Sequence, residues 1–213
     1  FKNIVFGFIR QCQQLLPDSS SNVYYRIPTL VHYLCLLYYH QQESFEPDWC
    51  HECIQLTQEN TVATWSRGGE KVVMLRNIVE SGCHCWKFKL LQYSGVYMTV
   101  IGVVKVPLTQ RRSLSAQLCF QQHKRTAYGF ELLSAETIDG DEEDSRKYGR
   151  KGKQGDVIEM ILDLNKRELR YAINGESQGV AYTNIAQTKY RAAISGFSSS
   201  VCYQLLSYMP SAA

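Results

Sequence analysis

The strongest constraint on the fold is a series of short alternating segments that begins near Cys53 and runs almost to the end of the chain. Turn-forming residues separate these segments at intervals of about ten residues. A period of two is typical of strands that bury one face, and this spacing of turns is typical of an all-β sandwich or barrel. The strands that we expect are 61–66, 71–75, 84–91, 97–104, 126–132, 156–163, 168–173, 190–196 and 201–208.

The segment 84–91 shows the alternation most clearly. Aromatic and apolar side chains take every second position, and cysteine or lysine fills the positions between them. Because successive side chains of a strand point to opposite faces, one face of this segment is expected in the core. The inward positions are His84, Trp86, Phe88 and Leu90, and the outward positions are Cys85, Lys87 and Lys89.

Two tight turns are predicted in the second half of the chain. Asn174-Gly175 follows the segment 168–173 and is a strong hairpin signal, because both positions of a two-residue turn need positive φ. Asn165-Lys166 predicts a second tight connection just upstream. No long helical pattern interrupts the strands, which argues against a parallel sheet with helical crossovers.

The first part of the chain has a different pattern and predicts a helical hairpin. Apolar residues in 3–16 recur with the 3.6-residue period of a helix, and Pro17 ends that segment. A second amphipathic helix is expected from Pro28, with Pro47 closing the region. We expect the apolar stripes to pack on each other and on the sandwich, although they could dock another chain. The predicted domains are a hairpin over 1–47, a sandwich over 48–209 and a tail over 210–213.

Composition excludes several other classes of protein. Hydrophobic residues make up 45% and charged residues 20%, as in ordinary globular domains, and the net charge of +3 does not indicate a nucleic-acid or membrane partner. The longest near-apolar run, 27–39, is too short to span a bilayer. The eight cysteines have irregular spacing and no Asn-x-Ser/Thr acceptor occurs, so we expect reduced thiols in an intracellular, cytoplasmic protein.

A charged segment over 139–153 is interpreted as a solvated loop. Its acidic block is followed closely by a basic block, so the opposite charges partly neutralise each other. The acidic block lacks the spacing of a calcium-binding loop. The basic block lacks the aromatic residues on which nucleic-acid bases stack.

Several short motifs, in order along the chain, resemble the SPRY domain family. Residues 81–88, Ser-Gly-Cys-His-Cys-Trp-Lys-Phe, are similar to the family's Ser-Gly-x-His-Tyr-Trp-Glu-Val strand, with Cys85 where tyrosine is usual. Ile101-Gly102-Val103, Tyr128-Gly129-Phe130 and the region 155–182 resemble further strands of the family. The resemblance covers about 53–208 and implies a bent antiparallel β-sandwich, a concanavalin-like jelly roll, without catalytic residues or a cofactor. The segment 27–38 weakly resembles helical segments beside signalling domains in some protists.

The resemblance also implies a partner-binding face formed by the segments 65–69, 105–125 and 195–198. Arg67 next to two glycines could present its guanidinium to a peptide carbonyl or carboxylate. Phe197, where the family often has tryptophan, could act as an aromatic anchor. The alternatives are a solvated turn cation for Arg67 and a core residue at a strand end for Phe197. The predicted partner-binding residues are Trp65, Arg67, Gly68, Arg111, Arg112, Phe120, Gly196 and Phe197.

Zinc is an alternative for four of the cysteines. Cys50 and Cys53 form a CxxC pair and Cys83 and Cys85 form a CxC pair, and four thiolates can hold zinc tetrahedrally. A CxC pair on a regular strand is poor local geometry for such a site, so no metal is expected.

The sequence therefore predicts a non-enzymatic protein–protein interaction module. It contains no nucleophile elbow, no His-Glu-x-x-His and no phosphate-binding loop. We expect it to bind a short segment of a partner protein through loops at one end of the sandwich. One form of this function is an adaptor that recruits a substrate protein. The alternative is a sandwich that binds a carbohydrate or another small ligand. Nothing in the sequence indicates an oligomeric state.

Overall fold

A computed structural model describes residues 43–69, 71–96, 98–107, 126–139, 145–197, 199 and 201–211. These residues form two antiparallel sheets of seven strands each, which confirms the predicted β-sandwich. The helical hairpin predicted over 1–47 lies outside the described residues, except for 43–47, where the strand β1 (Phe45–Cys50) begins. The described part of the chain contains no helix, and so none that could cross a membrane.

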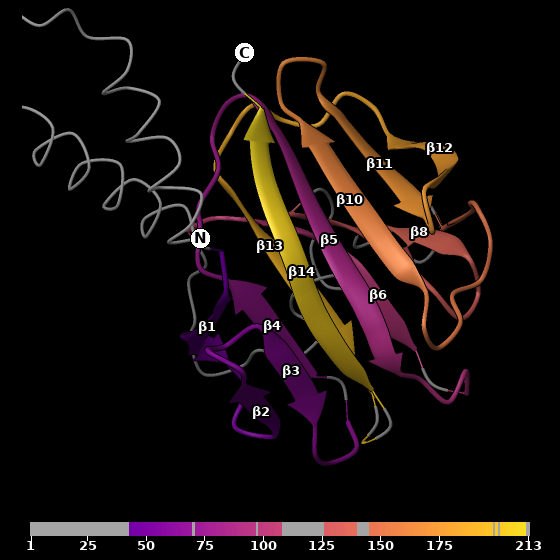
Figure 1. The fold of residues 1–213 in the computed structure, drawn as a ribbon. Helices are drawn as coiled ribbons and strands as arrows, with labels where there is room; N and C mark the ends of the chain where they lie inside the picture. The colour runs from indigo at the N-terminus through magenta and orange to yellow at the C-terminus, as the bar shows by residue number, and fades with distance from the viewer. Residues whose placement is uncertain are drawn as a thin grey trace, which may run out of the picture. The chain divides into compact units, whose positions relative to one another are not determined.

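Each sheet mixes strands from distant parts of the chain (Figure 1). The first sheet has the order β1, β4 (Lys71–Leu75), β13 (Tyr190–Gly196), β6 (Thr99–Lys105), β7 (Ala127–Glu131), β8 (Glu136–Ile138) and β9 (Arg146–Lys147). The second sheet has the order β12 (Glu176–Tyr182), β11 (Glu168–Ile173), β10 (Val157–Asp163), β5 (Cys83–Gln92), β14 (Cys202–Ser211), β3 (Val62–Trp65) and β2 (Ile54–Thr57).

All nine predicted strands are present, with shifts of a few residues at their ends. The strand β14 continues to Ser211, opposite Cys83, and so extends into the range predicted as a tail. The described residues also form β1, β2, β8, β9 and β12, which the alternation did not predict. Four of these five lie at sheet edges, where a strand has only one neighbour and its burial pattern is weak.

The main core lies between the sheets. On β5 the four predicted inward residues are buried, and the residues between them are more exposed, which confirms the predicted alternation. The largest side chains in this core are aromatic, and they come from both sheets. A second, smaller apolar cluster lies on the other face of the first sheet and consists of Val72, Met74, Val100, Val104, Ala127 and Ala193.

The predicted hairpin turn at Asn174-Gly175 is confirmed. The two residues have φ of 54° and 81°, and they connect the paired residues Ile173 and Glu176. The connection at Asn165-Lys166 is longer, because it joins the paired residues at 163 and 168. Both arrangements keep consecutive antiparallel strands side by side in the second sheet.

Candidate partner-binding site

Three connections between strands meet at one end of the sandwich (Figure 1, lower end). The register of the first sheet places the three connections together. Gly196 at the end of β13 is opposite both Lys71, which begins β4, and Thr99, which begins β6. We call this region the loop end. It consists of the described residues of the β3–β4 turn (66–69), the β5–β6 connection (93–96 and 98) and the β13–β14 connection (197, 199 and 201).

Backbone hydrogen bonds join these three connections to one another. The Gly69 N–H donates to the Phe197 carbonyl oxygen at 2.8 Å, and the Phe197 N–H donates to the Met98 carbonyl oxygen at 3.2 Å. Gly69 has φ of 102°, a conformation that favours glycine. The backbone of Phe197 is therefore fixed from both neighbouring connections.

Trp65 supports the loop end from inside the core. Its side chain is fully buried, its Nε1–H donates to the Lys71 carbonyl oxygen at 3.0 Å, and its ring meets Tyr203 edge to face at 6.1 Å. The sequence analysis placed Trp65 on the partner-binding face. A side chain without exposed surface cannot form that face, and in this structure Trp65 is a core residue beneath the loop end.

Gly196, which was also predicted to bind the partner, is buried as well and so does not form the exposed face. Its lack of a side chain allows Trp65 to pack closely. A Cβ atom added at Gly196 would lie 3.1 Å from both Cε2 and Nε1 of the Trp65 ring. This is tighter than ordinary van der Waals contact, and the buried ring has little room to move.

Replacing Gly196 with alanine is therefore expected to destabilise the fold by about 1–3 kcal/mol, because the added methyl group overpacks the site. Urea unfolding followed by tryptophan fluorescence measures this change. Gly68→Ala is the matched control, because a Cβ atom at Gly68 has no neighbour within 4 Å. Equal stabilities of the two variants would show that the contact with Trp65 is not tight.

The exposed surface of the loop end combines apolar and cationic side chains. Phe197 is 37% exposed and Val96 is 65% exposed, while Arg67 and Gly68 are also exposed. The predicted Arg67, Gly68 and Phe197 thus lie on connections that meet at one end. The sequence analysis did not identify Val96 as a site residue. The signal that could have identified it is a valine directly after the turn residues Ser94 and Gly95.

The segment 105–125 was also predicted to contribute to the partner-binding face. Arg111, Arg112 and Phe120 lie outside the described residues. Lys105, where the segment begins, is opposite Tyr190 and accordingly lies at the far end of β6 from Thr99. Six residues of strand span roughly 20 Å, so the described beginning of this segment is remote from the loop end.

The four cysteines of the alternative zinc site are divided between the two sheets and the β1–β2 turn, where Cys53 lies. Cys50 is opposite Val73 in the first sheet, whereas Cys83 and Cys85 lie on β5 in the second. Within the described ranges, no group of three or more His, Cys, Asp or Glu side chains is arranged to hold a metal ion.

The fold and the loop end define a class of β-sandwich that is known from other proteins. The family model described as the SPRY domain matches residues 83–206, which is more than half of the chain. This chain therefore belongs to the SPRY domain family. Domains of this family are in general non-enzymatic protein–protein interaction modules.

Solved structures show the same fold. The SPRY domain of human HERC1 has 20% identity and a TM-score of 0.63, over 76% of this chain and 96% of that chain. The TRIM65 PSpry domain has 13% identity and a TM-score of 0.59, over 78% of this chain and 90% of that chain. Stonustoxin has 16% identity and a TM-score of 0.56, over 78% of this chain and 27% of that chain.

Proposed function

We propose that this chain binds a short, extended segment of a partner protein through its loop end. The observation that carries the proposal is Phe197, an exposed aromatic residue whose backbone is hydrogen-bonded to both neighbouring connections. Because these hydrogen bonds already hold the backbone of Phe197, binding there would lose little conformational entropy. Aromatic residues held in this way are common anchors of interfaces.

The chemistry of the loop end fits a peptide with an apolar side chain beside a hydrogen-bond acceptor. Phe197 and Val96 supply apolar surface for the side chain. Arg67 supplies a planar set of N–H donors for a peptide carbonyl or a carboxylate. Gly68 leaves open space next to Arg67, since a Cβ atom there has no neighbour within 4 Å.

The proposal includes an adaptor role, in which the sandwich brings a bound protein to another domain or subunit. Recognition at the loop end would use one end of the sandwich and leave the outer face of the second sheet for other contacts. We also propose a reducing, intracellular location. It is supported by Cys50, Cys53, Cys83, Cys85 and Cys202, which are free thiols in the described part of the chain.

Phe197→Ala and Arg67→Ala are expected to weaken partner binding without unfolding the protein. The probe is a peptide selected on the full chain from a random-sequence phage library, and its affinity is measured by calorimetry. We expect a loss of about thirtyfold for Phe197→Ala and about five- to tenfold for Arg67→Ala, as for an anchor and a rim donor. The melting temperature should fall by less than about 3 °C.

Ile78→Ala and Lys166→Ala are the matched controls for this experiment. Ile78 is 49% exposed and follows β4 at the end away from Lys71, and Lys166 is an exposed turn cation. Both controls should keep the wild-type affinity. Unchanged peptide binding by Phe197→Ala, or a large fall in its melting temperature, would contradict the proposal. Binding to a glycan array that Phe197→Ala abolishes, with no peptide selected, would instead support the carbohydrate alternative.

A further inference from the structure

Two thiols lie next to each other on the outer face of the second sheet. His84 and Trp86 of β5 are buried between the sheets, so Cys83 and Cys85 point to the opposite face. Residues two apart on a strand share a face and are separated by about 7 Å along it. Both thiols are free and partly exposed.

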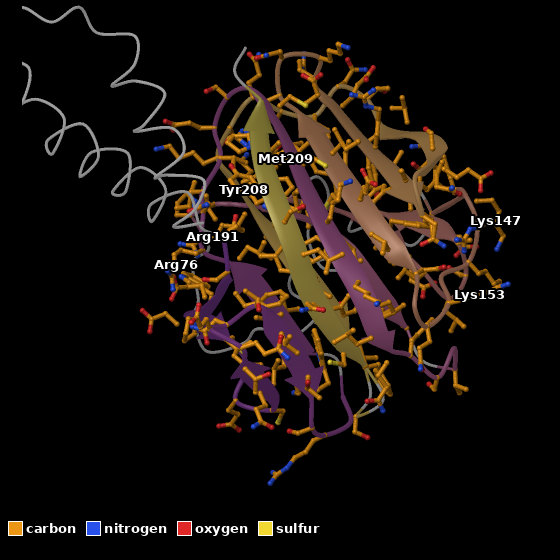
Figure 2. The ribbon with its side chains drawn as sticks, viewed as in Figure 1. Arg76, Lys147, Lys153, Arg191, Tyr208 and Met209 are labelled. Atoms are coloured by element: carbon orange, nitrogen blue, oxygen red, sulfur yellow. The ribbon has the colours of Figure 1, made fainter. Side chains whose placement is uncertain are left out.

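A thioether from the neighbouring strand lies on the same face. Met209 on β14 is directly opposite Cys85, and its side chain is 52% exposed. Tyr208, the preceding residue, is opposite Trp86 and stacks on its ring at 5.4 Å, which places Met209 on the outer face. Figure 2 labels both residues near the upper end of β14. Side chains of directly opposite residues have Cβ atoms about 4.5–5.5 Å apart.

We propose that the side chains of Cys83, Cys85 and Met209 bind a soft monovalent metal ion, namely Cu(I). Thiolate and thioether sulfur are the ligands that select Cu(I). One ion would bind to two thiolates and one thioether. The two thiol protons would be released to solvent, so that atoms and charge balance.

The same geometry argues against zinc at this place. Structural zinc sites use four ligands from cysteine, histidine or carboxylate, and a thioether is not among them. The nearest carboxylates on this face have other partners: Glu159 pairs with Lys87 at 3.1 Å, and Asp163 accepts the N–H groups of residues 165 and 166. Ile161, opposite Cys85 on β10, adds an apolar flank.

Anaerobic titration of the full chain with Cu(I), in competition with the chelator bicinchoninate, tests the proposal. The double variant Cys83→Ser with Cys85→Ser is expected to bind one Cu(I) equivalent fewer than the wild type. Met209→Leu keeps the size of the side chain but removes its sulfur. It should lower the affinity for the Cu(I) ion at this site by about three- to tenfold. Cys53→Ser, in the β1–β2 turn, is the control and should bind like the wild type.

Release of protons gives a second readout. Burial raises the pKa of both thiols, and the neighbouring carboxylate raises it further, Asp163 for Cys83 and Glu159 for Cys85. Two protons should therefore leave for each ion bound, and the apparent affinity should rise about a hundredfold per pH unit between roughly pH 6 and 8. The charged groups that act on these thiols are Asp163, Glu159, Lys87, Lys166 and Arg170.

Two results would overturn the proposal. One is a double variant that stays folded by circular dichroism and binds as many Cu(I) ions, with the same affinity, as the wild type. The other is a Met209→Leu variant with wild-type affinity, which would show that the thioether is not a ligand. The cysteines elsewhere in the chain are the same in the wild type, the double variant and Met209→Leu, so they contribute the same background to these three proteins.

Discussion

Replacing Trp86 with alanine is expected to lower the free energy of unfolding by about 3–5 kcal/mol. The ring is fully buried, and it stacks with Tyr208 at 5.4 Å and with His84 at 5.8 Å. Alanine would leave a cavity that the two rigid sheets cannot close. Urea unfolding, monitored by far-UV circular dichroism, measures the loss in the free energy of unfolding. A loss below about 1 kcal/mol would contradict the packing described here.

Trp86→Phe separates the packing of this residue from its hydrogen bond. The Trp86 Nε1–H donates to Oε2 of Glu43 at 3.1 Å, and Glu43 is itself buried. Phenylalanine keeps most of the aromatic contact but removes this donor, so we expect a smaller loss of about 1–3 kcal/mol. Burial already raises the pKa of Glu43, and the donated hydrogen bonds lower it. Trp86→Phe should therefore raise that pKa further, which NMR titration of the carboxyl group can measure.

The second large effect is expected at Asp156, a buried carboxylate with several donors. It accepts two hydrogen bonds from the Arg150 guanidinium, at 2.8 and 3.2 Å, one from the Lys153 N–H at 2.9 Å and one from the Asn174 side chain at 2.8 Å. Asp156→Ala would leave these groups without their acceptor. Because Arg150 is partly exposed and screened by water, we expect a loss of about 2–3 kcal/mol.

The loss at Asp156 should depend on pH. Burial raises the pKa of Asp156, but the hydrogen bonds from Arg150, Lys153 and Asn174 outweigh it and hold the pKa below its usual value. A carboxyl group with a lowered pKa in the folded state stabilises the fold above the unfolded-state pKa of about 3.9 and loses this effect as pH falls through the folded value.

The difference in stability between wild type and Asp156→Ala should accordingly be constant near neutral pH and shrink below about pH 4. Unfolding in urea at a series of pH values measures it. Glu46→Ala is the control, because Glu46 forms an exposed ion pair with Arg76 at 3.3 Å and such pairs contribute only about 0–1 kcal/mol. A difference that grows as the pH falls would contradict the lowered pKa.

The central strands of the second sheet could be predicted from the sequence because they bury one face and leave the other more exposed. On β5 and β11 this burial forces a period of two, which is visible without a structure. Edge strands lack this constraint. The strand β12 exposes most of its residues, and β1 contains Pro47, which a strand tolerates at an edge. Neither strand alternates in a way that predicts it.

The candidate site, too, could be predicted from the sequence only in part. The sequence alone determined that Arg67, Gly68 and Phe197 lie in connections, because glycine and serine surround them and strands flank them. Only the tertiary structure decided which connections meet. It buries Trp65 beneath the site, exposes Val96 beside it, and places the beginning of the segment 105–125 at the far end of β6. The physical reason is register: pairing between β4, β13 and β6 depends on contacts between distant segments, which a local pattern of residues does not record.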